Sequence, residues 1–250
     1  MESAQADLTS RAAVSRVSPA DRLIVALDLP SSTAALQLVD ELQGVCRWFK
    51  VGMELYYAAG NSIVTHLRDR GFDVFLDLKL HDIPNTVAGA IRTVSSTGAS
   101  LLTIHAAGGE KMIRAAVQAA SHPDSPRLLA VTVLTSMDAG DLNATGVPDS
   151  PETQVVRLAK LARNAGVAGL VCSPQEAAAV RQAVGDDALL VVPGVRPAGT
   201  AGSDDQARVA TPEQAIASGA SMLVVGRPIT QAADPAKAAA AFLAAIQAAQ

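Results

Sequence analysis

Short apolar runs recur along the chain, and each is followed by a stretch in which apolar residues return at helical spacing. The runs do not alternate with polar residues, which indicates strands that are covered on both faces, as in a parallel sheet. The pattern predicts eight strands, which span Leu23–Leu29, Trp48–Val51, Phe72–Lys79, Leu101–His105, Leu128–Leu134, Ala168–Cys172, Leu189–Val192 and Met222–Val225.

The stretches between these runs predict amphipathic helices. They span Ser32–Gln43, Thr86–Ser96, Glu110–Ala120, Gln154–Asn164 and Pro174–Val184. Ser173-Pro174 and Thr211-Pro212 place a proline at a first helical position, which is a common helix start. The alanine-rich segment from Ala236 predicts an outer helix. Glycines fall where the helices should end, at Gly44, Gly71, Gly98, Gly166, Gly185 and Gly219.

Eight strand–helix units in about 230 residues favour a (β/α)8 TIM barrel over an open sheet. The first strand–helix junction, Asp28 to Ser32, lacks the G-x-G-x-x-G fingerprint of a Rossmann dinucleotide fold. No low-complexity linker divides the chain. We therefore expect a flexible N-terminal tail over residues 1–20 and a single α/β barrel domain, the catalytic domain, over residues 21–250.

The amino-acid composition excludes several classes of protein function. Hydrophobic residues make up 49% of the chain, which excludes a disordered polyampholyte. The net charge is −4 and aromatic residues are only 3%, which argues against a nucleic-acid partner. No apolar segment is long enough to span a membrane, and the first twenty residues lack the apolar core of a secretion signal. With Cys46 and Cys172 too few for a disulfide framework or a metal cage, we expect a cytoplasmic protein with no membrane partner.

The densest group of charges follows the third predicted strand, in Asp77-Leu78-Lys79-Leu80-His81-Asp82. Asp77 and Lys79 are two residues apart, so on a strand they point to the same face. Asp82 lies just past the strand end, where it can bend back, and Lys50 ends the preceding strand. Carboxylates on both sides favour a protonated lysine, which can donate a proton to a carbanion. A structural ion pair is the alternative interpretation of the spacing.

A second signal lies at the end of the last strand, where Gly226 and Arg227 precede a helix. Barrels commonly bind phosphate in the loops after strands seven and eight, where glycine admits close backbone approach. The long loop from Gly194 to Val209 carries Arg196 and Gln206, and it predicts a lid or a binding loop. The alternative is a surface excursion without function.

These motifs together resemble the orotidine 5′-phosphate decarboxylases of the bacterial type. Besides Asp77-x-Lys79-x-x-Asp82, the resemblance includes the segments 25–28, 49–52, 131–137, 193–197 and 224–230, in the same order, and covers nearly the whole chain after the tail. It implies a cofactor-free, metal-free lyase that converts orotidine 5′-phosphate to uridine 5′-phosphate and CO2, the last step of de novo pyrimidine (UMP) biosynthesis.

The resemblance also implies a role for each matching residue. Asp28 and Lys50 would contact the ribose, and Lys50 would also pair with Asp77. Asp77, Lys79 and Asp82 would form the reacting array, with Lys79 as the proton donor. Asp82 and Thr86 would enter the site of the other subunit of a homodimer. The remaining substrate contacts would be Thr135 or Ser136 at the pyrimidine, and Arg196, Gln206, Gly226 and Arg227 at the phosphate.

Three alternatives stay open at this point. One is a general aldolase with a Schiff-base lysine, but such a lysine must be neutral, which two flanking carboxylates oppose. A related metal-dependent 3-keto-sugar-phosphate decarboxylase or hexulose-phosphate synthase would share the D-x-K-x-x-D motif. Those enzymes are expected to carry a glutamate metal ligand at the end of strand two, where this chain has Lys50. A non-catalytic phosphate-binding barrel would have little reason to keep Asp77, Lys79 and Asp82 together.

Overall fold

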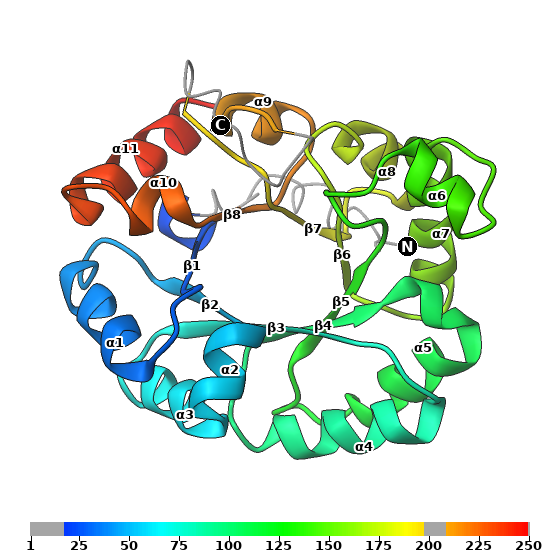
Figure 1. Ribbon diagram of the computed structural model, residues 1–250, viewed down its shortest axis with the longest axis horizontal. Coiled ribbons are helices and arrows are strands. Elements are labelled where there is room, and N and C mark those ends of the chain that lie inside the picture. Colours follow the sequence, from blue (N-terminus) through cyan, green and yellow to red (C-terminus); the bar gives the residue numbers. More distant parts are fainter. Residues whose placement is uncertain (1–17, 198–208, 250) are drawn as a thin grey trace, which may run out of the picture.

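The eight predicted strands form a closed parallel barrel in which each strand pairs with its neighbours in chain order and β8 returns to β1. This computed structural model describes residues 18–197 and 209–249 (Figure 1). The strands are β1 (Leu23–Ala26), β2 (Trp48–Gly52), β3 (Asp73–Leu80), β4 (Leu101–His105), β5 (Arg127–Val131), β6 (Gly169–Val171), β7 (Leu189–Val192) and β8 (Met222–Val225). The predicted (β/α)8 barrel is therefore confirmed.

The helices surround the strands as an outer ring (Figure 1). They are α1 (Ser32–Glu41), α2 (Met53–Ala59), α3 (Asn61–Asp69), α4 (Pro84–Ser95), α5 (Gly109–Ala119), α6 (Ala139–Ala144), α7 (Pro151–Asn164), α8 (Ala177–Val184), α9 (Pro212–Ala217), α10 (Arg227–Thr230) and α11 (Pro235–Ala248). Two 3-10 turns, η1 (Pro19–Asp21) and η2 (Ala106–Gly108), precede β1 and α5. The alanine-rich segment forms the expected outer helix, α11. No helix in the described ranges has the length and apolar character that crossing a membrane requires.

Two apolar cores lie on opposite faces of the strands. The inner core fills the barrel with side chains such as Ile24, Phe75 and Leu129. The outer core packs the other strand faces, including Val25, against the helices. Because successive strand residues point to opposite faces, both cores draw on the same strands. This burial on both sides explains why the apolar runs in the sequence do not alternate with polar residues. Cys46 and Cys172 are both buried in the outer core.

Two strands end three residues earlier than predicted. β1 ends at Ala26 rather than at Leu29, and β5 ends at Val131 rather than at Leu134. The next apolar residues still pack into the outer core, as Leu27 does after β1. Burial therefore continues past the last paired residue, so an apolar run overestimates the length of its strand.

One of the two helix starts predicted at a proline is wrong. Pro174 lies in a turn, and α8 begins at Ala177. The Ser173 hydroxyl contacts the carboxylate of the buried Glu176 across this turn. This side-chain contact holds the turn in place of the helix cap that the sequence predicted. The predicted start at Pro212 is confirmed, with the Thr211 side chain accepting a hydrogen bond from the Gln214 amide.

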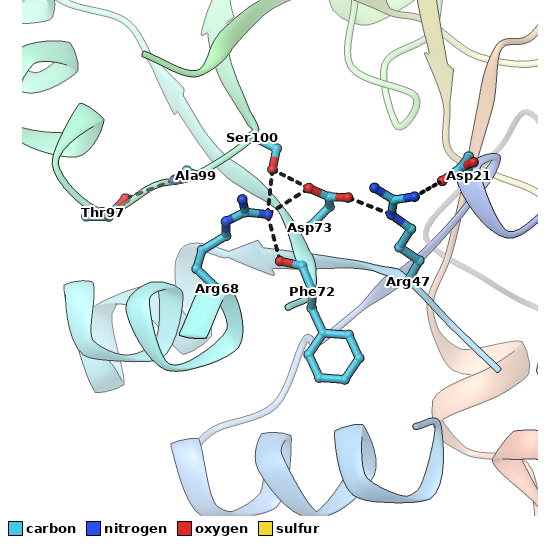
Figure 2. Close-up of polar contacts among 8 residues, drawn as sticks. All are labelled: Asp21, Arg47, Arg68, Phe72, Asp73, Thr97, Ala99 and Ser100. Carbon is cyan, nitrogen blue, oxygen red and sulfur yellow. Dashed lines mark hydrogen bonds and ion pairs between the residues drawn. The ribbon is translucent and has the colours of Figure 1, made fainter. Parts of the chain in front are cut away.

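A polar network links the strand starts at the N-terminal end of the barrel (Figure 2). The Asp73 carboxylate accepts hydrogen bonds from Arg47 Nε at 2.8 Å and from Arg68 Nη1 at 2.7 Å. Ser100 Oγ donates a third, at 3.0 Å, and Arg47 also pairs with Asp21 at 3.0 Å. Burial raises the pKa of Asp73, but these partners outweigh it and hold the pKa below its ordinary value. The network joins β3, β4 and the entry to β1.

A cavity of about 930 Å³ opens at this same end, and its walls include Arg22, Trp48 and Arg181. The guanidinium of Arg181 donates to backbone carbonyls of Gly185, Ala188 and Gly219. None of the predicted site residues lines this cavity. Since residues at the N-terminal face of such barrels serve stability, the candidate site is at the other end.

Candidate active site

Inward positions in the C-terminal halves of three neighbouring strands carry polar side chains, Lys50, Asp77 and Thr103. Each lies two residues beyond an inward apolar side chain, namely Trp48, Phe75 and Leu101. Lys50 and Asp77 are only 8% and 9% exposed, and Thr103 is fully buried. The alternation of a strand therefore places these groups at the C-terminal mouth of the barrel, on top of the inner core.

Asp77 lies between two lysines. Its Oδ2 is 2.8 Å from Lys79 Nζ and 3.8 Å from Lys50 Nζ. Lys79 comes from the same strand, as its spacing predicted, whereas Lys50 comes from β2. The expected pairing of Asp77 with both lysines is therefore present.

Asp28 follows the end of β1 and completes a row of alternating charges. Lys50 Nζ donates to Asp28 Oδ1 at 2.7 Å. A methyl group at Gly52 would lie 2.8 Å from Lys50 Nζ and 2.9 Å from Asp28 Oδ1. A side chain at this position would therefore require the Lys50–Asp28 pair to shift.

The electrostatics keep Asp77 ionised. Burial raises the pKa of the Asp77 carboxyl. The charges of Lys50 and Lys79 and the hydrogen bonds from Lys79 and Thr103 lower this pKa, and their combined effect is larger than that of burial. The pKa of Asp77 is thus held below its ordinary value. His105, at the end of β4, has a lowered pKa because of burial and the nearby His81 and Lys79, which disfavours its charged form.

The backbone of Lys79 is unusual. Its φ of 50° makes it the one non-glycine residue with a left-handed conformation in the described ranges. The pairing of β3 with β4 shifts register between Leu76 and Leu80, across this position. The Lys79 amide donates instead to Thr103 Oγ1 at 2.8 Å, and the same hydroxyl donates to Asp77 Oδ1 at 2.9 Å.

Two adjoining cavities lie over this array. One, of about 240 Å³, is lined by Lys50, Asp77 and Lys79 and by apolar side chains such as Val133. Thr135 lines this cavity, whereas Ser136 is exposed and is not among its lining residues. Of the two predicted pyrimidine contacts, the structure brings only Thr135 to the array.

The second cavity, of about 330 Å³, holds the predicted phosphate residues Arg196, Gly226 and Arg227. Asp28 and Val224 line both cavities, so the two adjoin. The base of the predicted binding loop is fixed, because Arg196 N donates to Ala210 O at 3.0 Å and Ala210 N donates to Gly194 O at 3.1 Å. Gln206 lies outside the described residues.

Asp82 and Thr86 do not join the array within this chain. Asp82 is exposed, and its carboxylate accepts a hydrogen bond from the Ile83 amide at 2.6 Å. In the described part of the chain it makes no hydrogen bond or ion pair with Asp77 or Lys79. Thr86 is exposed in the first turn of α4.

Two residues of the array were not among the candidates from sequence. Thr103 carries a signal that could have found it, because it follows Leu101 at the inward spacing near the end of a strand. Gly52 carries none, because its function depends on two side chains that meet over it. In the described ranges, no group of three or more His, Cys, Asp or Glu side chains is arranged to hold a metal ion.

Residues 21–242 match the Orotidine 5′-phosphate decarboxylase / HUMPS family. The chain belongs to this family. It is 54% identical over 226 residues to the orotidine 5′-phosphate decarboxylase of Anaeromyxobacter sp. (strain K), covering 90% of this chain and 98% of that protein. The orotidine 5′-phosphate decarboxylase of Nitrosospira multiformis is 52% identical over 216 residues, 86% of this chain and 89% of the relative.

Solved structures agree with these relatives. The crystal structure of orotidine 5′-phosphate decarboxylase from Lactobacillus acidophilus is 39% identical, with a TM-score of 0.80, and the match covers 90% of this chain and 99% of that one. The family name also includes HUMPS proteins. The relatives named above are all decarboxylases of orotidine 5′-phosphate.

Proposed function

We propose that this protein decarboxylates orotidine 5′-phosphate to uridine 5′-phosphate and CO2. The observation that carries the proposal is the row of alternating charges Asp28–Lys50–Asp77–Lys79, which adjoins a cavity lined by Arg196 and Arg227. A site of this form offers one region to a reacting carboxylate and another to a phosphate. Family membership and the names of the relatives support the same reaction.

The reaction breaks the bond from C6 of the pyrimidine to its carboxylate and leaves a carbanion, which must then take up a proton. We assign the proton to Lys79 Nζ, which forms an ion pair with Asp77 Oδ2 at 2.8 Å. The ammonium stabilises the developing negative charge before it transfers the proton. Asp77 lies where it opposes the substrate carboxylate, so loss of CO2 relieves a repulsion between two anions.

Lys79 alone does not account for the barrier. A pair of unit charges 4 Å apart at an effective dielectric constant near 20 is worth about 4 kcal/mol. Enzymes commonly lower barriers by about 8–23 kcal/mol. We therefore assign part of the rate to binding energy from the phosphate, held by Gly226, Arg227, Arg196 and Gln206, which forces the carboxylate toward Asp77. Asp28 and Lys50 hold the ribose, and Thr135 contacts the pyrimidine.

The proposed active unit is a homodimer in which Asp82 and Thr86 complete the site of the partner. The exposure of both side chains and the separation of Asp82 from the array of its own chain support this arrangement. Ile83, next to Asp82, is 67% exposed, so an apolar side chain also faces outward there. The proposed mechanism uses no cofactor, and we place the enzyme in the cytoplasm at the last step of UMP synthesis.

A metal-dependent 3-keto-sugar-phosphate decarboxylase or hexulose-phosphate synthase is the second candidate, since the family name spans both groups. In this chain the end of β2 carries Lys50, whose ammonium forms an ion pair with Asp28 at 2.7 Å. A cation at this position repels a metal ion instead of binding it. The Lys50 ion pair therefore favours orotidine 5′-phosphate as the substrate.

The test is a turnover assay with chelator-treated protein. We expect conversion of orotidine 5′-phosphate to uridine 5′-phosphate, and loss of nearly all of it in Lys79→Ala. Lys160→Ala, an exposed lysine on α7, serves as the matched control and should be fully active. Chelator-sensitive turnover, an active Lys79→Ala protein, or turnover only of a sugar phosphate with added magnesium would contradict the proposal.

A further inference from the structure

Thr103 is a fully buried residue on β4 whose hydroxyl lies between the Asp77 carboxylate and the Lys79 amide. We propose that Thr103 is a positioning residue for the reaction, which fixes the orientation of the Asp77 carboxylate and the left-handed backbone of Lys79. This inference rests on the proposed function, because it concerns how the decarboxylation array is held.

The directions of both hydrogen bonds follow from the groups involved. A carboxylate can only accept and an amide N–H can only donate. The single hydroxyl proton of Thr103 therefore goes to Asp77 Oδ1, at 2.9 Å, and a lone pair of the same oxygen accepts from Lys79 N, at 2.8 Å. One side chain on β4 thus holds two residues of β3.

Thr103 makes the two oxygens of Asp77 inequivalent. Oδ1 is bonded to the hydroxyl, while Oδ2 contacts Lys79 Nζ at 2.8 Å and is 3.8 Å from Lys50 Nζ. The carboxylate cannot rotate without breaking one of these contacts. Without the hydroxyl, Oδ1 would lose a donor at a buried position, which is costly for a charged group.

The same hydroxyl replaces a lost sheet contact at Lys79. The β3–β4 register shifts between Leu76 and Leu80, and Lys79 has a φ of 50°. A left-handed conformation is unfavourable for a residue with a side chain, so it persists only where its surroundings hold it. The bond from Lys79 N to Thr103 supplies such a hold, and the direction of the Lys79 side chain depends on that backbone.

Thr132 provides a matched control. It directly follows β5 and is only 3% exposed, and its hydroxyl donates to Val171 O at 3.0 Å. It has no contact with Asp77 or Lys79 in the described residues. Thr103→Val and Thr132→Val therefore remove the same hydroxyl at comparable burial, but only the first variant disturbs the array.

The experiment measures kcat, KM and the pH dependence of kcat for the wild type, Thr103→Val, Thr103→Ser and Thr132→Val. We expect kcat of Thr103→Val to fall about 10- to 100-fold with KM little changed, because the lost bond orients reacting groups and not the phosphate. Thr103→Ser, which keeps the hydroxyl, should recover most of the rate. Thr132→Val should match the wild type.

The acid limb of the pH profile separates positioning from stability. Charged groups that face Asp77 are Lys50 on β2 and Lys79 on its own strand, and the neighbouring titratable group on β4 is His105, whose pKa burial lowers. The Thr103→Val substitution removes none of these three side chains. Loss of a hydrogen bond to the charged form raises the pKa of Asp77, so the acid limb of kcat should move to higher pH. A role in stability alone would lower the melting temperature and leave this limb in place.

Three results would overturn the inference: a wild-type kcat and acid limb in Thr103→Val, an equal loss in Thr103→Ser, or an equal loss in Thr132→Val. If Thr103→Val does not fold, Thr103→Ala removes the same hydroxyl with less steric demand and carries the same expectations. A wild-type protein that does not turn over orotidine 5′-phosphate would contradict the proposed function itself, which distinguishes the two failures.

Discussion

Lys79 Nζ lies 2.8 Å from Asp77 Oδ2, and it does so from a residue whose backbone is left-handed. The two residues share one face of β3, but both lie where the pairing of β3 with β4 shifts register, between Leu76 and Leu80. The ion pair therefore combines a spacing written in the sequence with a local distortion of the strand. Lys50 and Asp77 are buried over the inner core, where interactions between charges are strengthened.

Gly52→Ala should impair catalysis more than folding. The backbone at Gly52 is extended, with φ of −89°, so alanine fits without strain. The new methyl group would meet Lys50 Nζ at 2.8 Å and Asp28 Oδ1 at 2.9 Å, which forces these flexible side chains apart. Because small displacements of positioned groups can cost about 100-fold in rate, we expect kcat/KM to fall by at least about 10-fold, measured by steady-state kinetics.

Gly140→Ala is the control for this change. Its methyl group would meet another carboxylate, Asp138 Oδ1, at 3.1 Å, but outside the array. Both variants should unfold at nearly the wild-type temperature, and only Gly52→Ala should lose activity. Wild-type kinetics in Gly52→Ala would show that the Lys50–Asp28 contact does not matter for the reaction.

Arg227→Ala should weaken the interaction between the protein and the substrate phosphate. Charge-assisted hydrogen bonds are worth about 1.5–3 kcal/mol each, so kcat/KM for orotidine 5′-phosphate should fall about 10- to 100-fold. With orotidine, which lacks the phosphate, variant and wild type should react at similar rates. The measurement is the ratio of kcat/KM for the two substrates. An equal loss with orotidine would mean that Arg227 acts on the array or on folding instead.

Mixed dimers test the shared site. If Asp82 completes the partner's site, a dimer of one Lys79→Ala chain and one Asp82→Ala chain has one intact site and one site that lacks both groups. Random exchange should then restore up to about a quarter of the wild-type activity from two inactive proteins. Mass spectrometry of differently labelled chains would verify the exchange. No recovery after verified exchange would place Asp82 in the site of its own chain.

Asp73→Asn should lower stability at neutral pH but not in acid. The pKa of Asp73 is lower in the folded protein than its ordinary value, so its contribution is complete above the unfolded pKa and is lost as pH falls through the folded pKa. We expect a loss of about 1 kcal/mol at neutral pH, because water screens the exposed Arg47. The loss should shrink below about pH 4, as measured by urea unfolding.

Asp40→Asn is the comparison for this prediction. Asp40 pairs with Arg70 at 2.6 Å, but its side chain is 64% exposed. Exposed ion pairs contribute little, so this variant should unfold like the wild type at both pH values. A loss in Asp73→Asn that persists unchanged in acid would show that its partners do not depend on the charge of Asp73.

Much of the barrel could be predicted from local patterns. Strands such as Leu101–His105 and Met222–Val225 have the bounds that the sequence predicted. The misplaced boundaries have one cause each: burial that continues past the paired residues after Ala26 and Val131, and a turn at Pro174 built from a side-chain contact. A run of apolar residues indicates which residues are buried. Where a strand ends depends instead on how far its backbone pairs with the neighbouring strand.

In the candidate site, too, some contacts could be predicted from the sequence and others could not. Asp77 and Lys79 could be paired from sequence because two residues on a strand share a face. The motif placed Asp82 beside them in sequence, yet the structure leaves it exposed and apart from the array. Thr103 joins the array from 24 residues further along the chain. Its spacing after Leu101 marks it as an inward residue, but its contacts with Asp77 and Lys79 depend on the pairing of β4 with β3.

The sequence by itself determined the order of the elements, the burial of the strands on both faces and the chemistry at the strand ends, because these depend on periodicity and residue type. Only the tertiary structure decided that Asp28 and Lys50 meet over Gly52, that Thr103 bridges Asp77 and Lys79, and that two cavities adjoin at Asp28. Those contacts depend on the closure and register of the barrel, which bring distant residues within bonding distance and are set by the packing of the whole chain.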